Sequence, residues 1–152
     1  MAILRLEEIG TVRSPVKAPV ETGWAGVVSD LVVEPRFAGG LKGIQEFSHV
    51  LVVFLMHQAW FDPGSDLVSR PEKREDLPEV GIFAQRARHR PNPIGTSAVK
   101  IEAVRGNVVT VRGLDAIDGT PLLDIKPYFP QFDRIESPVV PEWVERLMRG
   151  YF

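Results

Sequence analysis

The chain has 152 residues, of which 44% are hydrophobic and 25% are charged, and twenty acidic against eighteen basic residues give a formal net charge of −2. A chain of this length suits one domain over residues 1–152, and the near-balanced charge argues against binding nucleic acid or membranes over the whole surface. The sequence has no cysteine, which excludes disulfides and thiolate metal sites, and no apolar run near the roughly 20 residues of a membrane span, so we expect a cytoplasmic protein.

Thirteen prolines and thirteen glycines divide the chain into short segments, most of which have the composition of strands. The segment 49–57 is apolar on both faces, which is typical of a central strand. Gly106 and Asn107 tolerate positive φ and predict a hairpin turn, while Pro127 predicts that the last strand lies at an edge or ends there. In chain order, strands are predicted near 4–12, 25–34, 49–57, 80–85, 94–104, 107–114 and 122–129.

Helix signals are sparse. The segment 37–47 predicts only a turn or two, because three glycines weaken it. The segment 141–150 is a better helix, and the shared face of Trp143 and Leu147 predicts that it packs on the sheet. Residues 59–79 show little pattern and predict a long loop, for which a lid, a subunit contact and a disordered excursion are alternatives.

The segment 81–97, GIFAQRARHRPNPIGTS, places three arginines just before Pro91 and Pro93. The prolines stiffen the backbone, and a guanidinium binds a carboxylate or phosphate with two parallel hydrogen bonds. Residues 86–105 hold five basic side chains and one acid, so any anion site of this acidic protein is expected there. The alternative is a surface turn whose arginines pair with nearby acids, and the residues alone leave the two interpretations close to even.

The segment 113–128, GLDAIDGTPLLDIKPY, gathers three aspartates within ten residues. Their spacing does not match an EF-hand, so no metal is predicted. Carboxylates on loops accept hydrogen bonds from ribose hydroxyls or ammonium groups, which makes this segment a candidate acceptor half of a site whose donor half is the arginine segment. The alternative is that Asp115 and Asp118 only cap turns.

His57 and Gln58 follow the most apolar strand. A histidine there is usually a hydrogen-bonded structural residue, although the pair also suits the reading of an adenine edge. The sequence contains neither G-x-G-x-x-G nor G-x-x-x-x-G-K-[ST], so a Rossmann or P-loop nucleotide site is not expected.

Five blocks, IGTVRSP, GLKGIQEFSHV, HQ, GIFAQR with RPNPIG, and LDAIDGTPLLDIKPYFP, resemble in order those of the TrmO-like tRNA methyltransferases, the TsaA-like domain family. The resemblance covers residues 9–130. It implies a mainly β fold, a compact single-sheet β-barrel with a few short helices, that binds S-adenosyl-L-methionine without a Rossmann fold and forms a homodimer. In tRNA-acting members the methyl group goes to the exocyclic nitrogen of threonylcarbamoyladenosine beside the anticodon.

The resemblance also implies site residues. Arg86 is expected to hold the methionine carboxylate, and backbone groups of residues 115–117 are expected to read the adenine or ribose. Phosphate contacts are expected from Arg88, Arg90 and Lys100. The full set of implied cofactor contacts is His57, Gln58, Arg86, Thr96, Leu114, Asp115, Ala116 and Ile117, with Pro19, Val20 and Glu21 after the RSP block.

Methyl transfer from a sulfonium is a one-step displacement, so the enzyme mainly aligns donor and acceptor and excludes water. The acceptor nitrogen loses a proton, for which Tyr128 is the first candidate and Asp124 or Asp118 the next. Lys126 is a candidate to stabilise developing negative charge. The alternative for residues 124, 126 and 128 is hydrogen bonding along one strand face.

Two features keep other functions open. The usual family block reads Ala-Thr-Arg-Ser, whereas residues 84–87 here are Ala-Gln-Arg-Ala, so two hydroxyls expected near the cofactor are missing. Longer members carry an additional C-terminal domain, whereas this sequence stops at Phe152. The alternatives are a cofactor- or RNA-binding module without turnover, favoured if Gln85 and Ala87 disable the acceptor side, and methyl transfer to a small molecule.

Overall fold

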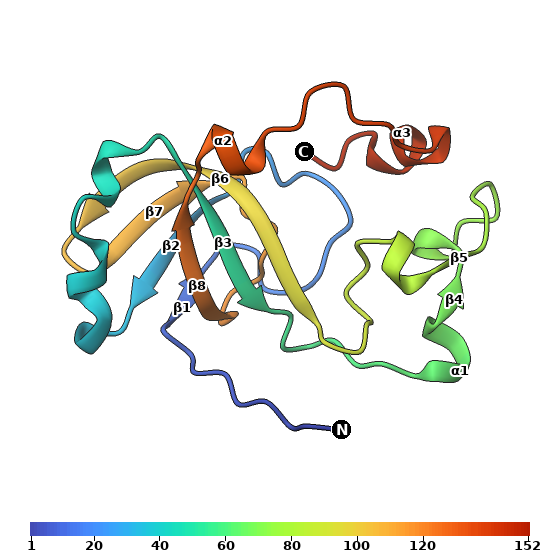
Figure 1. The fold of residues 1–152 in the computed structure, drawn as a ribbon, viewed down its shortest axis with the longest axis horizontal. Coiled ribbons are helices and arrows are strands. Elements are labelled where there is room, and N and C mark those ends of the chain that lie inside the picture. The colour runs from blue at the N-terminus through green and yellow to red at the C-terminus, as the bar shows by residue number, and fades with distance from the viewer.

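A closed barrel of six antiparallel strands forms the centre of the computed structural model, which describes residues 1–152 (Figure 1). The order around the barrel is β1-β2-β7-β6-β3-β8, and every neighbouring pair is antiparallel. The prediction of a mainly β barrel without a Rossmann fold is therefore confirmed. The strands are β1 (Gly10–Arg13), β2 (Val28–Val33), β3 (His49–Leu55), β6 (Ile94–Arg105), β7 (Val108–Arg112) and β8 (Pro121–Pro127).

The alternation of side chains along β3 shows how the barrel is filled. Val50, Val52 and Phe54 point inward and are buried, whereas the apolar residues between them are only partly buried on the outer face. β3 has a hydrogen-bonded neighbour on each side, as predicted for a central strand. Opposite Phe54 stands Gly95, where a Cβ would come within 2.5 Å of the phenyl ring, so β6 needs glycine at this position.

The ends of the strands follow the predicted signals in the later half of the chain. Gly106 has φ of 60° in the turn between β6 and β7, which confirms the hairpin. Pro127 is the last residue of β8, which confirms a strand end.

Residues 37–47 form two 3₁₀ turns, η1 (Pro35–Leu41) and η2 (Ile44–Glu46), in place of an α-helix, as three glycines allow.

Two strand predictions were too long. Residues 1–8 are exposed and pair with no strand, and β1 begins only at Gly10; the contacts of this segment are made by charged side chains, such as that of Glu7 with Arg36. Residues 80–85 divide into a two-residue strand, β5 (Val80–Gly81), and a 3₁₀ turn, η4 (Ile82–Ala84). The chain turns there because Ile82 is buried and its carbonyl accepts the N–H of Gln85.

Residues 56–93 leave the barrel between β3 and β6 and form what we call the excursion. It contains α1 (Pro63–Asp66), β4 (Val68–Ser69), η3 (Pro71–Lys73), β5 and η4, and β4 pairs with β5 in a separate two-stranded sheet. In Figure 1 it stands to the right of the barrel. The stretch predicted as a patternless loop therefore has local structure of its own.

The C-terminal region contains α2 (Pro130–Asp133) and α3 (Glu142–Met148). α3 does not pack on the sheet as predicted; it lies beside the excursion, where Arg146 donates to the Asp76 carbonyl at 3.1 Å (Figure 1). The reason is that α3 is short and buries none of its side chains. No helix is long and apolar enough to cross a membrane.

Residues 149–152, which we call the C-terminal strap, return toward the barrel. The N–H of Gly23 donates to the Gly150 carbonyl at 3.1 Å, and the N–H of Trp24 donates to the Tyr151 carbonyl at 3.0 Å. The strap is thereby fastened to the loop between β1 and β2, which occupies the space between the barrel and the excursion in Figure 1.

Candidate functional site

Arg86 reaches from the end of the excursion back onto β6. Its Nη2 donates to the Thr96 carbonyl at 2.6 Å and lies 3.4 Å from Thr96 Oγ1. Neither Arg86 nor Arg88 nor Arg90 forms an ion pair with a carboxylate. The alternative in which these arginines pair with nearby acids is therefore wrong, and the Arg86 guanidinium keeps N–H groups for an anion.

The other two arginines of the segment have different surroundings. Arg90 Nη1 donates to the carbonyls of Gln85 and Ala87, at 3.0 and 3.3 Å, so it braces the loop. Arg88 Nε donates to His89 Nε2 at 3.3 Å, and the His89 ring lies tilted against exposed Trp60, with centroids 4.1 Å apart and 42° between the ring planes. Of the pair, Arg88 is the freer to contact a ligand.

Asp115 is held from two directions. Its Oδ1 accepts a hydrogen bond from the Ser97 hydroxyl, and its Oδ2 accepts one from the Tyr151 hydroxyl at 2.5 Å. Ser97 follows Thr96 directly on β6, so the arginine segment and the turn at residues 113–118 meet at consecutive residues of one strand. The two loops, which are separated in the sequence by β6 and β7, are thus brought together.

The turn 113–118 holds backbone N–H groups that have no partner. Leu114, Ala116 and Ile117 are exposed by 0%, 3% and 9%, Asp115 is half-buried, and none of the N–H groups of residues 114–117 donates a hydrogen bond within the protein. The indole N–H of Trp24, which is also buried, has no partner either. Because nearly all buried polar groups in proteins are paired, this arrangement fits a bound ligand that carries hydrogen-bond acceptors, as an adenosine does.

Tyr151 is the site residue that the sequence reasoning missed. Burial raises the pKa of its phenol strongly, the hydrogen bond from the phenol to Asp115 raises it further, and the charge of Arg86 opposes these effects. Tyr151 is therefore a protonated donor near Arg86. Only its position just after Gly150 could have drawn attention to it, and that signal says nothing of where the chain leads.

The remaining expected cofactor contacts make fewer contacts with Arg86 and the turn 113–118. His57 and Gln58 are exposed and follow Met56, whose N–H donates to the Pro93 carbonyl at 2.8 Å, so they adjoin the arginine segment. The charge of Glu21 acts on Tyr151, which brings the loop after the RSP block close to the turn. Pro19 and Val20 in the same loop are exposed.

The family motif placed the side chain of residue 85 near the cofactor, but Gln85 points into the excursion. Its side chain is 7% exposed and its Nε2 donates to the Ser69 and Val80 carbonyls at 3.2 and 3.0 Å. The amide therefore fastens β4 and β5 inside the excursion. Replacement of the small hydroxyl residue by glutamine serves the packing of this region.

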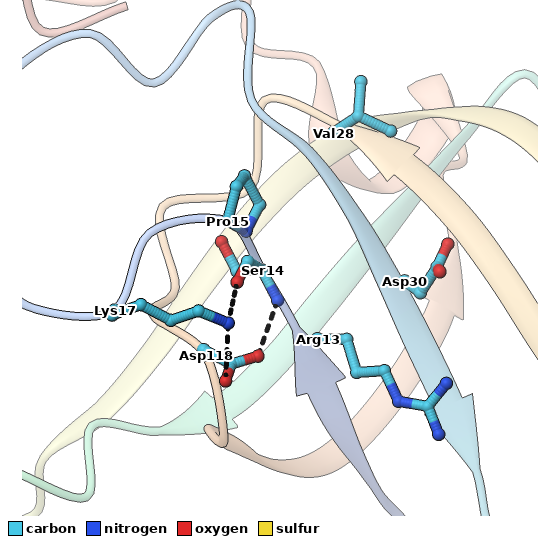
Figure 2. Close-up of a pocket in the computed structure, with 7 residues that line it drawn as sticks. All are labelled: Arg13, Ser14, Pro15, Lys17, Val28, Asp30 and Asp118. Atoms are coloured by element: carbon cyan, nitrogen blue, oxygen red, sulfur yellow. Dashed lines mark hydrogen bonds and ion pairs between the residues drawn. The ribbon is translucent and has the colours of Figure 1, made fainter.

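Asp118, one of the proton-acceptor candidates, lies in a shallow polar hollow (Figure 2). The figure shows the Ser14 N–H, at 2.9 Å, and Lys17 Nζ, at 2.9 Å, converging on its carboxylate. These contacts, the Ser14 N–H first and Lys17 next, hold the pKa of Asp118 below its usual value, which makes it a weak base. Apart from Pro15 and Val28, the residues that line the hollow are polar or charged, so it does not suit an adenine ring.

The other three candidates lie on or just after β8. Lys126 Nζ is 2.5 Å from Asp124 Oδ2 on the outer face, and this contact raises the pKa of Lys126. Asp124 and Thr96 both stand opposite Val53, so they are two strand spacings, about 10 Å, apart. Tyr128 adjoins His49, whose partner on β6 is Lys100, four residues or about 13 Å from Thr96.

No group of three histidine, cysteine or acidic side chains is arranged to hold a metal.

Comparison with known proteins identifies the family of the chain. Residues 11–134 match the family described as the tRNA-methyltransferase O N-terminal domain. A probable S-adenosyl-L-methionine-binding protein of Pyrococcus abyssi is 41% identical over 143 residues, which are 91% of this chain and 74% of that protein. A tRNA (adenine(37)-N6)-methyltransferase of mouse is 36% identical over 126 residues, which are 83% of this chain and 28% of that protein.

The fold is shared with solved structures as well. A crystal structure of TrmO from Pseudomonas aeruginosa superposes with a TM-score of 0.76 at 31% sequence identity, and the match covers 94% of this chain and 62% of that one. The chain thus spans less than two thirds of the TrmO protein it resembles. With the family match over most of its length and a superimposable barrel, the chain belongs to the TrmO family.

Proposed function

We propose that this protein binds S-adenosyl-L-methionine and transfers its methyl group to a nucleoside of tRNA, with the exocyclic nitrogen of threonylcarbamoyladenosine beside the anticodon as the acceptor. One observation carries the cofactor part of the proposal: N–H groups without partners at residues 114–117 lie next to an arginine without a carboxylate partner. The names of the relatives, which include S-adenosyl-L-methionine-binding proteins and a tRNA methyltransferase, support the same chemistry.

The two halves of the site suit the two ends of the cofactor. The free N–H groups of Arg86 suit the carboxylate of the methionine part, with which a guanidinium makes paired hydrogen bonds. The N–H groups of residues 114–117 suit the nitrogen and oxygen acceptors of adenosine. When bound, the cofactor supplies a methyl group on a positively charged sulfur, and the displacement needs only an aligned acceptor and the exclusion of water.

On the acceptor side, the S–CH₃ bond breaks as an N–CH₃ bond forms, and the acceptor nitrogen gives up one proton. Asp124 and Tyr128 are the proposed proton acceptors, and the strand register favours Asp124 because it stands in the same cross-strand row as Thr96. Lys126, beside Asp124, is the proposed partner for developing negative charge.

The RNA is proposed to contact the cationic end of the excursion. Arg88 and Arg90 form no ion pair with an acid, and exposed Trp60 beside them offers a surface on which a base can stack. Lys100, the third expected phosphate contact, stands on β6 at 3.9 Å from Glu102 and contributes less for that reason. Because the whole chain is acidic, RNA affinity is expected to be modest and to fall as salt is raised.

The same family membership leads us to propose a cytoplasmic homodimer. Sedimentation velocity over a range of protein concentrations tests the dimer. A monomer at the concentrations used for methyl transfer would contradict it.

The experiment that tests the function measures transfer of a labelled methyl group from S-adenosyl-L-methionine to total tRNA. The matched control is tRNA from cells that cannot make threonylcarbamoyladenosine. We expect label in the first tRNA and none in the second. Cofactor binding without any transfer would favour a binding module, and label only in small molecules of a cell extract would favour a different acceptor.

A further inference from the structure

We infer that Tyr151 is a positioning residue of the cofactor site: its hydroxyl holds Asp115, and through Asp115 it fixes the turn 113–118 in the conformation that binds the cofactor. The inference rests on the proposed function, because it assumes that the N–H groups of residues 114–117 face the cofactor. It adds to that site a residue and a segment, the C-terminal strap, that lie beyond the family match at residues 11–134.

The first argument is the fixed orientation of the Asp115 carboxylate. One oxygen accepts from Ser97 on β6 and the other from Tyr151 on the strap, so donors from two separate segments fix its orientation. Each oxygen keeps a further acceptor site, so these contacts do not prevent a ribose hydroxyl from binding. Asp115 is thus a group that fixes the turn through Ser97 and Tyr151.

The second argument is how the strap is fastened. The carbonyls of Gly150 and Tyr151 accept the N–H groups of Gly23 and Trp24, and the Trp24 side chain is only 3% exposed. Tyr151 therefore joins the turn 113–118 to the loop between β1 and β2, which contains the expected cofactor contacts around Glu21. One side chain couples two loops that are expected to enclose the same ligand.

The third argument is the protonation of Tyr151. Burial and the contact with Asp115 both raise the pKa of the phenol, so it stays a hydrogen-bond donor at every physiological pH. A phenolate would repel the carboxylate. The hydrogen bond is therefore permanent in the folded protein near neutral pH, as a positioning contact requires.

The test is the affinity for S-adenosyl-L-methionine, measured by calorimetry on the full chain. Tyr151→Phe keeps the ring and removes only the hydroxyl, and Ser97→Ala removes the other donor to Asp115. The chain has two tyrosines, so Tyr128→Phe makes the same chemical change just after β8, at a residue proposed to act on the acceptor proton and not on the cofactor; it is therefore a matched control for cofactor affinity alone. Thermal unfolding of each variant checks that it is folded.

We expect Tyr151→Phe to weaken binding about tenfold and Tyr128→Phe to leave it unchanged. In transfer assays the Tyr151 change should raise KM for the cofactor and leave kcat at saturating cofactor nearly unchanged. The effects of Tyr151→Phe and Ser97→Ala should be non-additive, because both act through Asp115. A residue that only stabilises the fold would lower the melting temperature without this pattern.

A spectroscopic reading gives independent evidence. In the Tyr128→Phe background Tyr151 is the only tyrosine, and its ionisation can be followed by absorbance as the pH is raised. We expect it to ionise above the usual range of tyrosine, and bound cofactor to delay ionisation further. Ionisation in the ordinary range, with or without cofactor, would overturn the hydrogen bond to Asp115.

The outcomes separate this inference from the proposed function. If the wild type binds the cofactor and Tyr151→Phe binds it equally well, the positioning role fails while the proposed function stands. If Tyr151→Phe binds it more tightly, the strap competes with the cofactor, and the inference is overturned. If the folded wild type does not bind the cofactor at all, the proposed function fails and this inference fails with it.

Discussion

The turn 113–118 and strand β8 follow each other in the chain, and both carry aspartates, but they use their charges differently. In the turn, Asp115 accepts hydrogen bonds from two other segments, and the backbone around it keeps buried N–H groups without partners. On β8, Asp124 pairs with its neighbour Lys126 on the outer face. The first arrangement fixes a carboxylate between two segments, whereas the second leaves an ion pair partly exposed on the outer face; we propose that the first serves the cofactor and the second the substrate.

The largest expected effect is on the rate of methyl transfer and comes from a change on β8. We predict that Asp124→Asn lowers the rate of methyl transfer at saturating cofactor about a hundredfold, because it removes a proton acceptor, and leaves cofactor affinity unchanged. Single-turnover kinetics with labelled cofactor and tRNA measure this rate. A larger loss in Tyr128→Phe than in Asp124→Asn would instead make Tyr128 the proton acceptor.

The next largest expected effect is on cofactor affinity and comes from a change in the turn 113–118. In Asp115→Asn, the amide N–H₂ replaces one carboxylate oxygen, so the hydroxyl of Ser97 or Tyr151 opposite it has to turn and accept instead of donate, and both hydrogen bonds lose the carboxylate charge that strengthens them. We predict that cofactor affinity falls about thirtyfold, an effect that calorimetry resolves easily. Unchanged affinity in a folded variant would argue against the turn as part of the cofactor site.

These predictions depend on contacts that the sequence could supply only in part. The barrel, its hairpin at Gly106 and the end of β8 at Pro127 follow from local rules of turn and strand chemistry. Family motifs pointed to Arg86 and Asp115. Tyr151 could not be found this way, because its contact with Asp115 joins residues 36 positions apart through a fold that no local pattern encodes.

The position of α3 shows a second limit. Its apolar face predicted a contact with the sheet, but periodicity does not say which surface a helix meets, and α3 lies beside the excursion. The excursion itself carries few periodic residues. It is ordered by buried polar contacts such as those of Gln85, which a hydrophobic pattern does not report.

A smaller effect is expected on the free energy of unfolding, from a change in the excursion that lies outside the candidate site. Gln85→Ala leaves the Ser69 and Val80 carbonyls without their donor, and we predict a loss of about 2 kcal/mol in the free energy of unfolding. Chemical denaturation measures it. Gln85→Thr, which restores the usual family residue, should be destabilised as well; full stability with threonine would show that the long amide is dispensable.

The smallest effect concerns Asp118, whose folded pKa lies below its ordinary value of 3.8. A depressed carboxyl pKa stabilises the folded protein above the unfolded pKa, and this contribution is lost as the pH falls through the folded value. We predict that Asp118→Asn lowers the melting temperature slightly at neutral pH and that its difference from the wild type disappears in strong acid. A difference independent of pH would contradict an ionic role.

The most direct test of the cofactor site is calorimetric titration with S-adenosyl-L-methionine of the wild type, Arg86→Ala and Arg88→Ala. The two variants remove the same charge two residues apart, but only Arg86 is bound to β6 beside the turn. We predict clear binding by the wild type, at least tenfold weaker binding by Arg86→Ala and little change in Arg88→Ala. Equal losses in both variants, or none in Arg86→Ala, would contradict the assignment of the methionine carboxylate to Arg86 and with it the site described above.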